Sequence, residues 1–206
     1  MNKLIKILLA FVLSCSCMAC SRTQEPVKEE KAVEKTENIK TKKGILNVTI
    51  TIPASFVGEE GVTQEELDQE VKEKGFKSAT INEDGSVTYV MSKSKQKELL
   101  KKMKEDMDGN LQDMIGGEST PNVTDIQVNK EVTEFTVTTT NTELDLGESF
   151  SCIALFMYGG LYNSFAGNED FDVLVTYKNA DSKEVIEKIS LREWISNIEE
   201  SQNENN

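Results

Sequence analysis

The chain has 206 residues, of which 36 are acidic and 23 are basic, so its net charge at pH 7 is −13. Acidic chains disfavour nucleic acid, because phosphates attract lysine and arginine. The sequence contains no histidine, which excludes histidine metal sites and catalysis by Ser-His-Asp or Cys-His groups. No glycine-rich phosphate loop or nucleophile elbow is present either. We therefore predict no nucleic-acid partner, no metal, no cofactor and no catalytic residues.

The first residues have the layout of a secretory leader. Lys3 and Lys6 precede the apolar run ILLAFVL at 7–13, and small residues and cysteines follow. A positive head, a short apolar run and small residues are typical of a signal peptide. The run is too short for a membrane span, which needs about 20 residues. We expect residues 1–19 to be a signal peptide.

Three of the four cysteines stand close together, at Cys15, Cys17 and Cys20. The stretch SCMAC, which ends at Cys20, resembles a bacterial lipobox, in which a peptidase cuts before a cysteine that then carries lipid. Ala19 supplies the small residue before the cut. Cleavage before Cys17 is the alternative, but Cys20 leaves a fuller apolar region. The resemblance implies a diacylglyceryl group on Cys20, and its two chains suffice for stable anchoring.

The lipobox also predicts the domain organisation. Residues 20–43 would be the lipid anchor and a charged linker, because this stretch lacks periodic apolar residues. Residues 44–198 are expected to form a single α+β domain, followed by a disordered tail at 199–206. An acylated Cys20 would leave only Cys152 as a free thiol, so we expect no intramolecular disulfide. Residues 44–206 hold 31 acidic and 14 basic side chains, a net charge of −17.

The first half of the domain has clear local signals. Residues 44–53 alternate as a half-buried strand does, with Leu46, Val48, Ile50 and Ile52 on one face. A helix is predicted over 63–74, with Thr63 and Glu66 as a capping box and Gly75 as its stop. Residues 77–91 read as a hairpin that turns at NEDGS.

A long helix is predicted next, from about 93 to 115, because leucine and methionine recur every three or four residues. Its segment DMDGNLQD (106–113) carries oxygen ligands of the kind that calcium prefers. The apolar stripe continues through this segment, so we interpret it as a solvated helix face rather than a metal site.

Paired strands and a third helix complete the domain. Strands are expected near 123–129 and 132–140, a helix at 148–165, and a last hairpin that joins 171–177 to 184–191. Since strands come in adjacent pairs, we predict an α+β fold with a mainly antiparallel sheet and about three helices packed on one face.

The third predicted helix contains the most unusual segment, because residues 149–167 carry no charge. As a helix, the segment has two apolar stripes. The first holds Phe150, Ile153, Ala154, Met157, Tyr158, Leu161, Tyr162 and Phe165, and the second holds Cys152, Leu155, Phe156 and Gly159. A helix that is apolar all round is normally central and buried. The alternative is a binding surface, for which the candidate residues are Leu155, Phe156, Tyr158 and Tyr162.

Several segments also carry a wider resemblance. The lipobox, the charged linker and the stretches ASFVGEE, DGSVTYVMSKSKQKELL and FMYGGLYNSF resemble an uncharacterised group of small lipoproteins from Gram-positive bacteria. The resemblance implies an extracytoplasmic location, anchored to the cell membrane by lipid, and no known activity. We expect a non-catalytic module that binds a protein or envelope ligand; the alternative is a cell-envelope enzyme, or enzyme accessory, that uses Asp and Glu.

Overall fold

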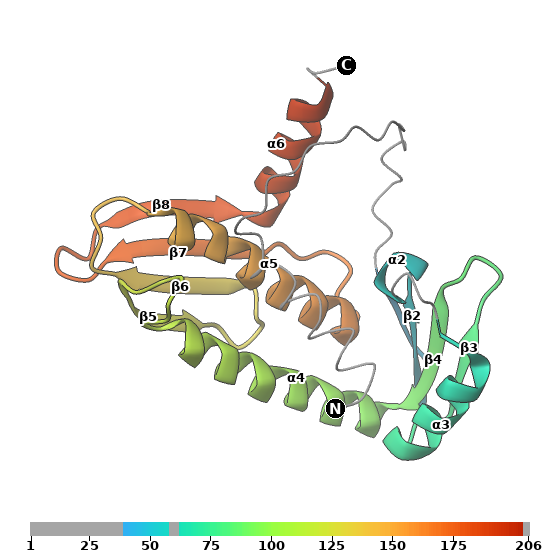
Figure 1. The fold of residues 1–206 in the computed structure, drawn as a ribbon. Coiled ribbons are helices and arrows are strands. Elements are labelled where there is room, and N and C mark those ends of the chain that lie inside the picture. The colour runs from blue at the N-terminus through green and yellow to red at the C-terminus, as the bar shows by residue number, and fades with distance from the viewer. Residues whose placement is uncertain (1–38, 58–61, 204–206) are drawn as a thin grey trace, which may run out of the picture. The chain divides into compact units, whose positions relative to one another are not determined.

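A computed structural model describes residues 39–57 and 62–203 (Figure 1). The predicted signal peptide, the lipid-anchor cysteine and most of the predicted linker lie outside these residues. The α+β class is confirmed, with strands that are mainly antiparallel. The strands form two sheets of four rather than the single sheet expected from the sequence.

The described chain divides into two compact units. Residues 39–40, 49–57 and 62–91 belong to the first unit, and residues 41–48 and 92–203 to the second. The sequence predicts one domain from 44 to 198. The two units count as one domain if they unfold together, which an unfolding experiment would measure. The single domain therefore stays a prediction.

The first sheet has the strand order β1-β2-β4-β3; the first unit holds β3 and most of β2 and β4, whereas most of β1 and the first residues of β2 belong to the second unit. The elements from residue 40 to residue 92 are β1 (Lys40–Lys43), β2 (Asn47–Ile52), α2 (Ala54–Val57), α3 (Gln64–Lys74), β3 (Ser78–Ile81) and β4 (Val87–Ser92). Alternate residues of β4 are buried, as the predicted pattern requires, and Met91 is almost completely covered. The ring of Phe76 meets the ring of Tyr89 edge-on, with centroids 5.5 Å apart.

The local signals in this unit are confirmed. Thr63 caps α3 through the backbone of Glu66, whose carboxylate accepts from the Thr63 N–H at 3.0 Å. Gly75 ends the helix in the left-handed conformation, with a φ of 69°. Strands β3 and β4 then pair antiparallel, as the NEDGS turn predicts.

Two predictions near the start of the domain are wrong. Strand β2 begins at Asn47 rather than at 44, and the Leu46 side chain is 76 % exposed instead of buried with its predicted face. Residues 45–46 form a bend, which breaks the alternation. Residues 40–43, predicted to be part of the linker, form strand β1, because pairing within a sheet can order a stretch that lacks an apolar pattern.

The second unit places helices on a sheet with strand order β5-β6-β7-β8. Its elements are α4 (Lys93–Met114), β5 (Val123–Val128), β6 (Glu134–Thr139), α5 (Leu146–Ala166), β7 (Leu174–Asn179), β8 (Val185–Ser190) and α6 (Leu191–Asn203). The outer pairs are antiparallel, but β6 and β7 run parallel. Parallel neighbours need a crossover connection, and α5 supplies it.

One face of this sheet forms the main core. Phe135 and Val137 of β6 and Val175 and Tyr177 of β7 are buried there against α5. Helix α4 adds Met107 and Leu111 to the same cluster. The alternate residues of β6 and β7 remain partly exposed, which indicates that the helices cover the face that bears Phe135.

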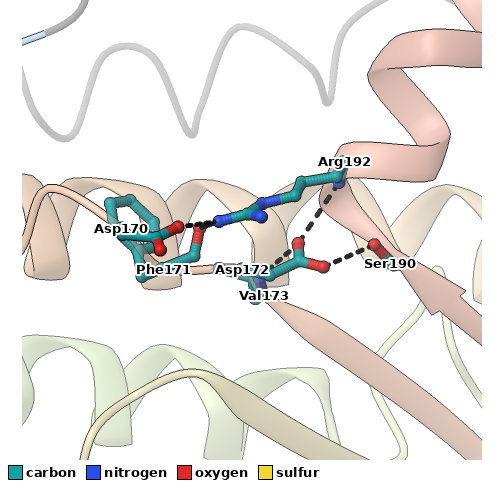
Figure 2. A network of polar contacts seen from close by, with 6 residues as sticks. All are labelled: Asp170, Phe171, Asp172, Val173, Ser190 and Arg192. Carbon is teal, nitrogen blue, oxygen red and sulfur yellow. Dashed lines mark hydrogen bonds and ion pairs between the residues drawn. The ribbon is translucent and has the colours of Figure 1, made fainter.

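Helix α6 departs from the prediction, which places no helix after residue 165. It includes residues 199–203, where a disordered tail is predicted. Asp172 holds the start of this helix: its carboxylate accepts hydrogen bonds from Val173 N at 2.8 Å, Ser190 Oγ at 2.7 Å and Arg192 N at 3.2 Å (Figure 2). The Arg192 guanidinium also binds the carboxylate of Asp170 and the carbonyl of Phe171.

Candidate functional site

The start of helix α5 is fixed by a capping box that the sequence analysis missed. The helix begins at Leu146, two residues before the predicted start. Asp145 accepts from Glu148 N at 2.8 Å, and the Glu148 carboxylate accepts from Asp145 N at 3.2 Å. The pattern Asp-x-x-Glu is a known helix-start signal, so the sequence contained the information needed for the correct start.

Glu148 is fully buried and ties α5 to the sheet. Thr139 Oγ1 of β6 and Asn141 Nδ2 both donate to its carboxylate, the latter at 3.0 Å. The Tyr177 hydroxyl donates to the Glu148 backbone carbonyl at 2.9 Å. These bonds use the Glu148 oxygens for structure, which argues against a role as a catalytic acid or base.

The far end of α5 is fixed by Asn163. Its buried Nδ2 donates to the carbonyls of Glu131 and Val132 in the β5–β6 connection, both at 3.1 Å. Val132 has a φ of 56°, which is unusual for a β-branched residue. Side-chain hydrogen bonds therefore attach the first end of α5 to the sheet and its far end to the β5–β6 connection.

The structure separates the four residues proposed as a binding surface. Leu155 and Phe156 are buried in the core, with Phe156 5.9 Å from the Trp194 ring of α6, so they cannot form a surface. Tyr158 and Tyr162 are partly exposed and lie toward α4. The ammonium of Lys104 sits 5.9 Å above the Tyr162 ring.

The assignment of the two apolar stripes of α5 is now clear. The second stripe, with Cys152, Leu155, Phe156 and Gly159, packs against the sheet. The expectation of a wholly buried helix fails on its other side, where Phe150 is 65 % exposed and Leu146 is 78 % exposed. Apolar periodicity alone could not tell which stripe meets the sheet, because both stripes are apolar.

We call the solvent side of α5 the outer stripe. It consists of Leu146, Phe150, Ala154, Met157 and Leu161, spaced three or four residues apart. The last three are half-buried, and the first two are among the most exposed large apolar residues of the described chain. The outer stripe is a continuous uncharged strip on a rigidly held helix.

Four exposed carboxylates lie close to α5 in space or in sequence, and we call them the acidic rim: Asp113, Glu118, Glu143 and Glu187. Burial and then the charge of Glu187 raise the pKa of the Cys152 thiol, so Glu187 lies beside α5. Burial and the charge of Asp113 raise the pKa of Tyr158, and a hydrogen bond with Asn110 opposes the shift. The connection that contains Glu118 reaches α5 at Gly147, where an added Cβ would lie 1.8 Å from Ser119 O.

Other chemistry is sparse in the described residues. Within 39–57 and 62–203, no cluster of three His, Cys, Asp or Glu side chains could hold a metal ion. The helices in these ranges also include none that is long and apolar enough to cross a membrane. Cys152 is buried, and its thiol lies 3.0 Å from the Ser149 carbonyl.

Comparisons with known proteins add no assignment. No protein-family model matches the chain, and neither a curated protein nor a solved structure shows significant similarity to it.

Proposed function

We propose that the protein is an extracytoplasmic lipoprotein, tethered to the cell membrane through Cys20, and that it works as a non-catalytic binding module. The observation that carries the binding role is the exposure of Leu146 and Phe150 on the side of α5 that faces away from the sheet. Soluble proteins seldom keep large contiguous apolar patches without a partner. The lipobox resemblance supports the location.

The carboxylates also favour binding over catalysis. An envelope enzyme without histidine would rely on Asp and Glu side chains that converge on a substrate. The carboxylates of Asp145, Glu148 and Asp172 each accept three hydrogen bonds, and all three hold helix starts in place. Their oxygens serve the fold, so we place the function on the apolar surface.

The membrane anchor is tested by substituting the cysteine. Cys20→Ala should abolish lipid labelling and move the protein from the membrane fraction to the soluble fraction, and Cys152→Ala serves as the matched control. Cys17→Ala tests the alternative cleavage site. The anchor proposal is wrong if the Cys20→Ala and Cys17→Ala proteins both remain acylated and membrane-bound.

The binding role is tested by site-specific photo-crosslinking in cells. A benzophenone amino acid at position 150 should give discrete adducts that are absent when it stands at position 136, on the strand face opposite the core. Equal patterns at the two positions would contradict a docking role for the outer stripe. Because Phe150 is exposed, the probe should leave the fold intact, which circular dichroism can confirm.

A further inference from the structure

The chemistry of the outer stripe favours one class of occupant. Its apolar residues run along one side of a helix for four turns, from Leu146 to Leu161. A straight strip of this kind matches the apolar face of another amphipathic helix, which is read through residues spaced three or four apart.

The charges around the strip restrict the occupant further. Glu187 pairs with Tyr177 in the sheet, and the Tyr177 hydroxyl contacts α5 at the Glu148 carbonyl, which places Glu187 near the first turns of α5, on its β8 side. Glu143 is exposed three residues before Leu146, and Glu118 and Asp113 are exposed on the α4 side. These four exposed side chains near α5 are therefore all negative.

This charge pattern disfavours two other occupants. A second copy of the chain would bring two acidic rims together, and like charges across an interface are unfavourable. Anionic lipid would be repelled in the same way. A cationic helix would instead gain both apolar contact and electrostatic attraction.

We propose that the outer stripe and the acidic rim together form a docking site for a basic amphipathic helix of a protein or peptide partner. The proposal rests on the binding function given above and specifies the chemistry of the partner. Phe150 and Leu146 supply the apolar anchor, and the rim carboxylates receive lysine or arginine side chains at the edge. Edge charges of this type mainly set association rate and specificity.

The experiment uses the full chain in zwitterionic nanodiscs and three labelled 18-residue peptides, with empty nanodiscs as the blank. One peptide is an amphipathic helix of Lys and Leu, the second replaces every Lys by Glu, and the third replaces every Leu by Ser. Fluorescence anisotropy should show binding of the Lys/Leu peptide only, and the affinity should fall as salt rises.

Matched variants separate the apolar and electrostatic parts. Phe150→Ser should weaken binding of the Lys/Leu peptide about tenfold, as expected for an anchor residue. Val185→Ser, an exposed apolar change on β8, should have no effect. Leu146→Ser repeats the test should the Phe150 variant misfold. The pair Glu143→Lys and Glu187→Lys should transfer preference to the Glu/Leu peptide, whereas Glu131→Lys with Glu134→Lys changes net charge equally and should not.

The outcomes distinguish the inference from the function on which it rests. Equal binding of the Lys/Leu and Lys/Ser peptides, or no loss in Phe150→Ser and Leu146→Ser, would overturn the docking site described here. Tighter binding of the Glu/Leu peptide would overturn the choice of a basic partner. In each case, discrete crosslinks from position 150 would still support the binding function, and their absence would reject it as well.

Discussion

Gly159 and Gly160 are neighbours in the chain but meet different surroundings. A Cβ added to Gly159 would lie 2.6 Å from Val173 Cγ2 and 2.9 Å from the Val132 carbonyl, whereas one on Gly160 would meet nothing within 4 Å. Gly159 is thus a point of close contact between α5 and the residues just before β6 and β7, and Gly160 faces open space.

Alanine should reveal this difference as opposite changes in stability. Gly159→Ala should destabilise the protein by about 1–3 kcal/mol, because it overpacks a closed contact. Gly160→Ala should stabilise it by about 0.5–1 kcal/mol, since alanine is the better helix former. Urea denaturation measures both values, and two changes of the same sign would contradict the packing described here.

A second matched pair tests the assignment of the two stripes of α5. Phe156→Ala should cost about 3–5 kcal/mol, because it opens a cavity in the core. Phe150→Ala removes the same side chain from an exposed position and should change the free energy of unfolding by about 0.5 kcal/mol or less. A Phe156→Ala protein that unfolds like the parent would show that the second stripe is not buried.

At the scale of elements, helix α6 depends on a few residues at its start. Asp172 accepts bonds from the backbone of Arg192 and the hydroxyl of Ser190, and the Trp194 ring packs near Phe156. The Asp170 side chain is 92 % exposed and joins these contacts through its ion pair with the Arg192 guanidinium. We therefore expect the Asp172 carboxylate, rather than the surface ion pair of Asp170 with Arg192, to hold the start of α6 in place.

Replacing Asp172 should loosen α6. Asp172→Ala removes the side-chain acceptor of Arg192 N at the start of the helix and should cost about 1 kcal/mol, as the loss of a cap does, whereas Asp170→Ala breaks a surface ion pair and should cost less. Trp194 is the only tryptophan in the chain, so its fluorescence reports on this helix directly. We expect the tryptophan emission to shift to the red in Asp172→Ala and to stay unchanged in Asp170→Ala. A red shift in Asp170→Ala alone would show that the ion pair, and not Asp172, holds α6.

The edge strands of the second sheet show how an element can limit unwanted contacts. The pairing of β5 with β6 is irregular between Val123 and Asp125, and that of β7 with β8 between Tyr177 and Lys178. Bulges at a sheet edge discourage pairing with another chain. For this reason we place the docking site on α5 and not on a strand edge.

At the scale of the whole molecule, buried tyrosines link stability to alkaline pH. Burial, as the main cause, raises the pKa of Tyr89 and of Tyr177 well above the usual value of 10.0. Below pH 10, both hydroxyls are protonated in the folded and unfolded chains. Above pH 10, the unfolded chain ionises first, so the stability that these groups contribute is lost as pH rises.

We therefore expect the free energy of unfolding to decline above pH 10, by up to about 1.4 kcal/mol per pH unit for each tyrosine. Tyr177→Phe should reduce that slope, although the loss of its hydrogen bonds lowers stability at neutral pH by about 1 kcal/mol. Urea melts between pH 8 and pH 11 measure the slope. An unchanged slope in Tyr177→Phe would show that the Tyr177 hydroxyl ionises as easily in the folded chain as in the unfolded chain.

Local signals in the sequence determined much of the secondary structure. The Thr63–Glu66 capping box, the Gly75 stop and the NEDGS turn act through neighbouring residues, so their outcome needs no distant partner. The long helix α4 follows from a regular apolar period. Strand β1 lacks such signals and was therefore missed. Helix α6 was also missed, although Leu191, Trp194, Ile195 and Ile198 recur at helical spacing in its sequence.

Only the tertiary structure decided where the candidate site lies. Both stripes of α5 are apolar, and the choice between them depends on Gly159, which permits close approach to Val173 and Val132. The division into two sheets and the parallel pairing of β6 with β7 depend on contacts between residues far apart in sequence. Burial of one stripe left Leu146 and Phe150 exposed, because a single helix can turn only one side to the sheet.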